Sequence, residues 1–388
     1  MTNSCQLIKS IFNAKKGNIQ MAEPIKNMYH YESILQVAND IQKVYSPFQV
    51  EDFMNSCVNE NWENLELKDR MIHTATTLGE YLPHDFCDAI QIIDQVVINY
   101  GDWLTNFCAF FPFYVEIYGR DKKDWDVAMK ALANYTQYSS SEFAVRWFIM
   151  NNEEKMMQQM LIWANDPSEH VRRLASEGCR PQLPWGQALT HFKEDPSLIL
   201  PILETLKNDT SLFVRKSVAN NLNDISKTHP EVVIKIAKKW YGKNKNTNWI
   251  VKHACRTLLK KGNKEVLSLF GFDNQDLIIR DFSLSSNEIS IGNEIIFSFE
   301  IHTKESARIR LEYGVDYVKS NSKRNRKIFQ ISEINLSENE TKKYVKKHSF
   351  ENVTVRKHYP GIHSITLIIN GVEKETIDFM VNSETLLP

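Results

Sequence analysis

The stretch SEHVRRLASEGCRPQLPWGQAL, residues 168–189, places a carboxylate where a purely structural helix would rarely have one. Glu177 falls in the last turn of a predicted helix, just before Gly178, a residue typical of helix C-caps. A carboxylate there faces the negative end of the helix dipole, so it costs stability. The structural alternative is a surface pair with Arg173 four residues earlier, worth roughly a few tenths of a kcal/mol. Glu177 is therefore a candidate functional carboxylate.

Trp185 follows the sequence RPQLP, in which Pro181 and Pro184 restrict the backbone. A tryptophan held on a stiff loop can stack on a base or a sugar, or contact a cation. It can equally serve as a core side chain that fills the space between structural repeats. The sequence leaves both interpretations open.

Two further carboxylates have different local settings. Glu142, in YSSSEF, is predicted in the first turn of a helix, where a carboxylate is favourable and an ordinary N-terminal glutamate is the default explanation. Asp224 lies on a predicted helix over residues 214–227, on a polar face opposite the apolar residues Val214, Val218, Leu222 and Ile225. The same helix contains three asparagines, which are poor helix formers. We therefore expect the face that carries Asp224, Ser217 and Asn220 to meet something polar.

Several kinds of chemistry are disfavoured by missing motifs. The chain has no P-loop, GxSxG, HExxH or GxGxxG motif, which argues against nucleotide hydrolysis, serine hydrolysis, metalloprotease and dehydrogenase activity. The six cysteines have no CxxC pairing and are interpreted as reduced thiols without a zinc site. We expect no metal and no organic cofactor.

The net charge of −1 conceals a segregated distribution. Residues 142–262 carry 19 Lys and Arg against 12 Asp and Glu, whereas residues 1–141 carry 11 against 18. A local cationic block suggests an anionic partner, and nucleic acid is the commonest one. A lysine-rich solvated helix face explains the charge equally well.

The segments that carry these side chains are predicted to be helical up to about Asn274. Apolar residues recur three and four apart in YESILQVANDIQKVY, LKDRMIHTATTLGEYL, DAIQIIDQVVINY, DWDVAMKALANYT and VVIKIAKKWYG. The length of 388 residues predicts two or three folding units. With no apolar run of about eighteen residues and no signal sequence, we expect an intracellular protein.

A repeat recurs within this helical half. Its three copies are DPSEHVRRLA at 166, DTSLFVRKSV at 209 and NTNWIVKHAC at 246, and each begins with an Asx residue that is expected to cap a helix. In the first copy we expect Asp166 to be the cap, Pro167 to take the first helical position and Glu169 to close a capping box. A helical period near 40 residues is typical of a HEAT-like array with a concave face. Arg172, Arg215 and Lys252 occupy equivalent positions, from which they can bind successive phosphates.

After residue 276 the hydrophobic period changes to two. About seven strand-like segments, with an Asn-Gly hairpin signal at 370, predict an antiparallel β-sandwich of immunoglobulin type. The basic segment KSNSKRNRK, residues 319–327, is either a solvated hairpin tip or a second contact for a nucleic-acid backbone. The predicted fold class is thus a HEAT-like α-solenoid followed by an immunoglobulin-like β-sandwich.

The motifs VRRLASEGCRPQLPWG and VRKSVANNLNDISKTHP resemble those of the AlkC-type DNA alkylation repair glycosylases. The resemblance extends from MAEPIKNMY through LELKDRMIHTATTLGEYLP and SSEFAVRWFI to WIVKHACRTLLKKGN, and VRWF departs from it by placing Trp147 where a proline is expected. It implies an N-terminal extension over residues 1–20, a helical DNA-binding and catalytic domain over 21–274, and a sandwich over 277–388. Glu142, Glu177, Trp185 and Asp224 match the family's SSEF, SEGxRP, LPW and NNLND motifs.

The resemblance implies that the protein excises cationic N-methylated bases, 3-methyladenine and 3-methylcytosine, from double-stranded DNA. Glu142 and Glu177 would stabilise the oxocarbenium-like sugar and position water, Asp224 would assist, and Trp185 would contact the sugar or the lesion. We expect a cytoplasmic monomer that associates with the nucleoid and not with a membrane. The residues predicted to contact DNA are Arg146, Arg172, Arg173, Arg180, Arg215, Lys216, Asn220 and Lys252.

The competing hypothesis is a non-catalytic HEAT-repeat scaffold that binds nucleic acid or protein through the same groove. Both hypotheses predict salt-sensitive binding, so a binding assay does not separate them. Release of a methylated base from alkylated DNA does.

Overall fold

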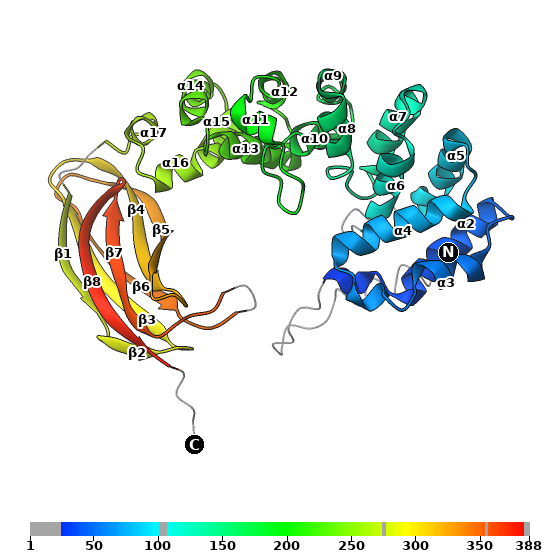
Figure 1. Cartoon of the computed structure of the whole chain (residues 1–388). Helices are drawn as coiled ribbons and strands as arrows, with labels where there is room; N and C mark the ends of the chain where they lie inside the picture. Colours follow the sequence, from blue (N-terminus) through cyan, green and yellow to red (C-terminus); the bar gives the residue numbers. More distant parts are fainter. Residues whose placement is uncertain (1–24, 101–106, 274–276, 354–355, 384–388) are drawn as a thin grey trace. The chain divides into compact units, whose positions relative to one another are not determined.

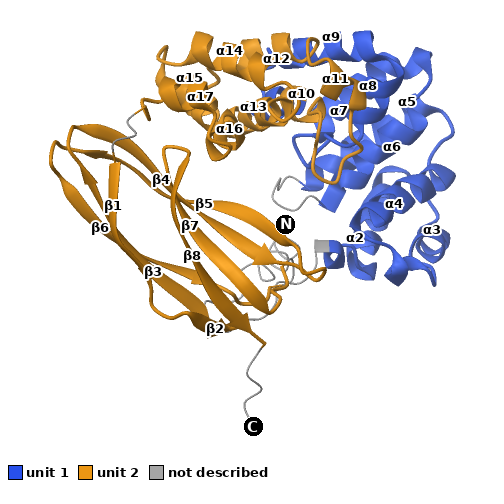
Figure 2. Cartoon of the chain, turned by 60° about the vertical axis from the view of Figure 1, so that its left-hand side comes forward, with its two compact units in different colours: residues 1–174 blue, residues 175–388 orange. Residues whose placement is uncertain are grey.

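The fold is described from a computed structural model in which residues 25–100, 107–273, 277–353 and 356–383 are placed. The predicted extension over residues 1–20 lies outside the described residues. The chain divides into two compact units, residues 1–174 and 175–388 (Figure 2). The division falls inside a single helix, and each unit is described by itself.

Unit 1 is helical throughout its described part (Figure 1). Its elements are η1 (Ile25–Met28), α2 (Tyr31–Val44), α3 (Val50–Cys57), η2 (Trp62–Asn64), α4 (Leu67–Tyr81), α5 (Phe86–Val97), η3 (Ile98–Tyr100), η5 (Phe107–Ala109), α6 (Phe110–Tyr118), η6 (Lys122–Asp124), α7 (Trp125–Tyr135), α8 (Val145–Asn151), α9 (Glu153–Trp163) and the first part of α10 (Glu169–Gly178). The predicted segments coincide with α2, α4, α5 and α7, because their apolar stripes form the core: in α2, for example, Ile34, Val37, Ala38 and Ile41 are buried.

Unit 2 begins with the end of α10 and continues with further helices. These are α11 (Thr190–Glu194), α12 (Leu200–Leu206), α13 (Leu212–Ile225), α14 (Pro230–Trp240), α15 (Lys245–Ala254), α16 (Arg256–Lys260) and α17 (Lys264–Leu269). No helix among the described residues has the length and apolar content needed to cross a membrane.

The helix starts differ in part from the expected caps. Helix α10 begins at Glu169, so Pro167 is not helical and Asp166 is not the N-cap; the Asp166 carboxylate instead accepts the Ser168 N–H at 2.7 Å in a turn before the helix. In the second copy Ser211 is the cap, and its hydroxyl accepts the Phe213 N–H. The third copy begins earlier than expected, because Asn244 caps α15.

The remainder of unit 2 is a β-sandwich, which confirms the predicted order of an α part followed by an immunoglobulin-like β part. One sheet has the order β1-β3-β6 and the other β2-β8-β7-β4-β5 (Figure 1). The strands are β1 (Leu277–Leu284), β2 (Glu288–Ser290), β3 (Glu294–Thr303), β4 (Ala307–Val318), β5 (Arg324–Leu336), β6 (Thr341–Ser349), β7 (Gly361–Ile369) and β8 (Val372–Asn382). The prediction missed β2, which is too short to show a period and pairs parallel with β8.

The core of the sandwich shows the expected alternation of buried and more exposed residues along a strand. Along β3, Ile295, Phe297, Phe299 and Ile301 point inward while the residues between them are more exposed. The Asn-Gly turn joins β7 to β8, with φ of 48° at Asn370 and 75° at Gly371, which are the positive angles that such hairpins require.

The sandwich contacts the last helices within unit 2. A Cβ built on Gly371 would lie 2.7 Å from the Cα of Gly262, so the two backbones touch at a point where only glycines fit. Lys252 of α15 forms an ion pair with Glu333 of β5, and Glu333 also accepts from Arg310 at 2.6 Å. The helices and the sandwich therefore share one interface.

Candidate active site

Glu142 belongs to unit 1 and lies in the turn before α8, not in its first helical turn as predicted. The reason is that the helix begins only at Val145, whose N–H donates to the Ser141 carbonyl. The Glu142 Oε2 atom accepts from Ser140 Oγ at 2.8 Å and pairs with Arg173 Nη1 at 2.6 Å. Glu142 is thus a largely buried carboxylate held by a hydroxyl and a guanidinium, the latter from α10.

A second carboxylate site, in unit 2, joins α10 to α13. Arg180 directs Nη1 to Glu177 at 2.5 Å and Nε to Asp224 at 2.8 Å, so one guanidinium binds two carboxylates. Glu177 is 6% exposed, Arg180 7% and Asp224 4%. Burial opposes the charge of Arg180, but Glu177 and Asp224 outweigh it and raise its pKa. Two residues 47 positions apart in sequence are therefore held together by a cation that lies between them.

This site changes the interpretation of Glu177 and Arg180. Glu177 lies in the last turn of α10, as predicted, but it is buried, which excludes the exposed surface pair considered from the sequence. Gly178 is the last residue of the helix and not a cap beyond it. Arg180 was predicted to contact DNA, yet its burial and its two carboxylate partners give it an internal role as their counter-ion.

The polar face of α13 meets a polar surface, as the sequence suggested, and that surface is protein. Ser217 is within 2.6 Å of the Ser176 hydroxyl, and Asn221 donates to the Ser176 carbonyl at 2.8 Å. Asn220 is half-buried and accepts from Arg256 at 3.0 Å. Asn221 and Asn220 thus form hydrogen bonds to other parts of the protein. Asn220 was predicted to contact DNA, but it is half-buried and binds Arg256.

Trp185 lies at the exposed tip of the loop that follows α10. Its side chain is 74% exposed, which excludes the alternative of a core tryptophan. Its φ of 61° is in the left-handed region, a conformation that costs a non-glycine residue about 1–2 kcal/mol. Buried Leu183 and Leu189 anchor the loop, and the Leu189 N–H donates to the Pro181 carbonyl at 3.2 Å. A strained backbone that presents an aromatic ring to solvent is typical of a binding residue.

The repeated arginines hold the turns before their own helices. Arg172 Nη1 donates to the carbonyls of Asp166 and Pro167, and Arg215 Nη1 donates to those of Asp209 and Thr210, all at 2.8–2.9 Å. The two equivalent positions therefore share a structural role that the repeat alone did not reveal. Whether the same side chains contact DNA stays a prediction.

Other predicted DNA contacts lie in different surroundings. Arg146 is 2% exposed and part of the core, so it is not a surface cation. The Lys252 side chain is 41% exposed, and its ammonium pairs with Glu333 of the sandwich. Lys216 is exposed and forms no ion pair with the residues that the structure describes. Of these three, Lys216 alone is exposed and forms no ion pair with the described residues.

Sequence reasoning missed Lys227, which follows the end of α13. Its Nζ atom pairs with Asp224 Oδ1 at 2.9 Å and donates to Gln182 Oε1 at 3.3 Å. The signal available was its position three residues after Asp224, on the same side of the helix end. The contact with Gln182, 45 residues earlier, has no sequence signal.

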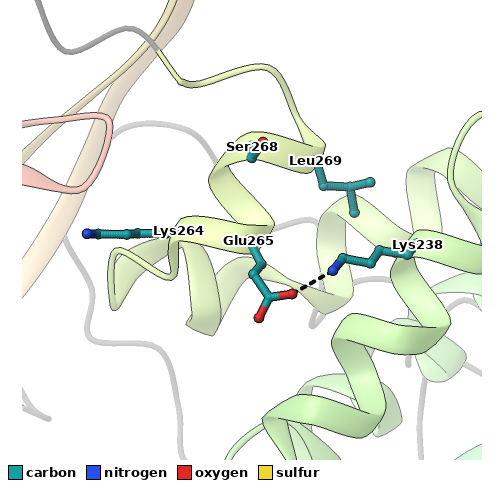
Figure 3. Close-up of a pocket in the computed structure, with 5 residues that line it drawn as sticks. All are labelled: Lys238, Lys264, Glu265, Ser268 and Leu269. Carbon is teal, nitrogen blue, oxygen red and sulfur yellow. Dashed lines mark hydrogen bonds and ion pairs between the residues drawn. The ribbon is translucent and has the colours of Figure 1, made fainter.

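Two pockets of unit 2 are lined by residues outside the candidate site. One of about 400 Å³ is lined by Lys238, Lys264, Glu265, Ser268 and Leu269, and Figure 3 shows the ion pair of Lys238 with Glu265 at its edge. Another of about 250 Å³ lies at the sandwich, beside Arg308 and Glu333. Neither of these two pockets is lined by Glu177, Trp185 or Asp224.

Two family models match the chain. The model described as DNA alkylation repair enzyme matches residues 119–258, which include all four predicted catalytic residues. The model described as the C-terminal Ig-like domain of the uncharacterised protein YhaZ matches residues 278–383, which cover most of the sandwich.

Two whole-length relatives support these matches. The uncharacterized protein YhaZ of Bacillus subtilis (strain 168) is 46% identical over 358 residues, which is 92% of this chain and 99% of YhaZ. The alkylpurine DNA glycosylase AlkC of Pseudomonas fluorescens, solved bound to DNA containing an abasic site analog, is 32% identical with a TM-score of 0.88. That alignment covers 92% of this chain and 99% of the solved chain.

Proposed function

The chain belongs to the family of the DNA glycosylase AlkC and is a DNA alkylation repair glycosylase, and we propose that it excises cationic N-methylated bases from double-stranded DNA. The substrates in this proposal are 3-methyladenine and 3-methylcytosine, and the reaction is hydrolysis of the N-glycosidic bond. Residues 21–274 are proposed as the DNA-binding and catalytic domain and residues 277–388 as an immunoglobulin-like domain, in a monomeric enzyme.

The chemistry of such a substrate suits anionic side chains. Methylation on a ring nitrogen makes the base a cation, which leaves as a neutral molecule and needs little help from a general acid. Positive charge then develops on the deoxyribose, where carboxylates stabilise it. The oxygen of water bonds to C1′ as the C1′–N bond breaks, and the proton of the water passes to a carboxylate or to solvent.

The observation that carries this proposal is the pair of carboxylates Glu177 and Asp224, fixed by Arg180 at the start of the loop that carries Trp185. Carboxylates that are already oriented stabilise a developing charge without reorganising during the reaction. We assign Glu177 and Glu142 to charge stabilisation and water positioning, and Asp224 to assistance. Trp185 is proposed to contact the sugar or the charged base.

DNA binding in this proposal uses the cationic block. Arg172, Arg173, Arg215 and Lys216 are retained as candidate contacts, since each is at least partly exposed. The AlkC structure bound to DNA supports a DNA partner for this chain.

The deciding experiment measures release of 3-methyladenine and 3-methylcytosine from methylated DNA by chromatography. Glu142→Gln and Glu177→Gln are each expected to slow release by about 100-fold, in the range found when one stabilising group is lost. Glu194→Gln, which changes an exposed glutamate of unit 2, is the control and should remain within about twofold of wild type. Unchanged release in both test variants would refute the site, and binding without release by the wild type would favour the scaffold.

A further inference from the structure

Lys227 contacts both the carboxylate Asp224 and the loop that carries Trp185. Its Nζ atom lies 2.9 Å from Asp224 Oδ1 and 3.3 Å from Gln182 Oε1, and Gln182 precedes Trp185 by three residues. We propose that Lys227 is a positioning residue that ties the Trp185 loop to Asp224. The effect on base release rests on the proposed function, whereas the tether itself does not.

The loop needs support of this kind because its tip is strained. Trp185 has a φ of 61° and little contact with its surroundings, so neighbouring groups must hold its backbone in place. Leu183 and Leu189 anchor the apolar side of the loop in the core. The hydrogen bond from Lys227 to Gln182 is a polar attachment from the end of α13.

Lys227 also completes the orientation of Asp224. Arg180 binds Oδ2 and Lys227 binds Oδ1, so each oxygen of the carboxylate faces one cation. Two partners on different oxygens fix the rotation of the carboxylate plane, which a single partner does not. The side chain of Lys227 is 39% exposed, so its pair with Asp224 is screened by water and contributes orientation more than stability.

From this geometry we expect Lys227 to affect the rate of base release and not the affinity for DNA. Loss of the tether frees the loop and leaves Trp185 less well placed beside the substrate, which is expected to slow the chemical step by about tenfold. The competing role for an exposed lysine is a contact with a DNA phosphate. That role would weaken binding and reduce the salt dependence of affinity, with no requirement for Gln182.

A double-mutant cycle on single-turnover base release separates the two roles. Lys227→Met and Gln182→Ala should each slow release by about tenfold, with affinity for undamaged DNA unchanged. The double variant should be no slower than the slower single variant, because both changes break one tether. Lys235→Met, at an exposed lysine of α14, is the matched control. Weaker binding by Lys227→Met together with an unaffected Gln182→Ala would overturn the proposal.

A second readout does not depend on catalysis. With 5-fluorotryptophan incorporated, the fluorine resonance of Trp185 is assigned as the line that Trp185→Phe removes. Lys227→Met and Gln182→Ala should both narrow and shift this line, because a released loop samples more conformations, and Lys227→Arg should restore part of the original shift. An unchanged line in both variants would refute the tether, even if the wild type released no base.

Discussion

Arg180 is expected to be a main electrostatic support of unit 2, because it is the internal partner of two buried carboxylates. Its replacement in Arg180→Met removes the guanidinium but keeps an unbranched, largely apolar stem. Glu177 and Asp224 then stay buried without this guanidinium, and Asp224 keeps its contact with Lys227. Breaking one buried pair costs about 3–5 kcal/mol, so a loss of at least this size in the free energy of unfolding is expected.

Arg326 provides the matched control. It also binds two carboxylates, Asp316 at 2.7 Å and Glu373 at 2.5 Å, but its side chain is 32% exposed. Because water screens these pairs and solvates the carboxylates left behind, Arg326→Met should lose no more than about 1 kcal/mol. The comparison tests the effect of burial, since each arginine binds two carboxylates.

Urea-induced unfolding of both variants at neutral pH measures these effects. Equal losses of unfolding free energy in Arg180→Met and Arg326→Met would show that Arg180 is not an essential buried counter-ion.

Three further predictions concern other parts of the molecule. Burial lowers the pKa of His348 to about 4, so His348 has no effect on stability above its ordinary pKa of 6.5. As the pH falls from 6.5 to 4, His348 should cost the sandwich up to about 3 kcal/mol. Urea unfolding of His348→Gln should therefore show a smaller acid loss than the wild type, and an equal loss would refute this; part of the loss should remain, because burial also lowers the pKa of His358. Lys216→Met should reduce the slope of log affinity for DNA against log salt by about one, whereas Arg146→Met should destabilise unit 1 and leave the slope unchanged. Gly371→Ala should lower the urea midpoint more than Gly242→Ala, since both have positive φ but a Cβ meets backbone only at 371; equal losses would argue against this contact.

Local patterns accounted for much of the architecture. The apolar spacing of α2, α4 and α7 predicted helices because a period near 3.6 leads to burial of one face. The missed strand β2 is three residues long, and its pairing with β8 depends on a segment about ninety residues away in the sequence. The start of α10 was misplaced because Asp166 can cap a helix or form a turn with equal local chemistry, and the turn was adopted.

In the candidate site, too, the sequence predicted which residues matter but not which side chains they contact. Glu177 was singled out because a carboxylate at the C-terminal end of a helix costs stability. The structure shows that this carboxylate is also buried, which adds to the cost. Arg180 was taken for a DNA contact, because a sequence records the charge of an arginine but not the direction of its guanidinium. The structure directs it to Glu177 and Asp224.

The charged residues, most helices and strands, and the Asn-Gly turn that joins two strands could be predicted from the sequence, because these properties depend on neighbours within a few residues. Which cation meets which carboxylate depends instead on how the helices pack. Asp224 reaches Arg180 across 44 residues and Gln182 reaches Lys227 across 45, through the packing of α13 beside the end of α10. Such contacts arise from the burial of whole helix faces, which sets distances that sequence separation does not encode.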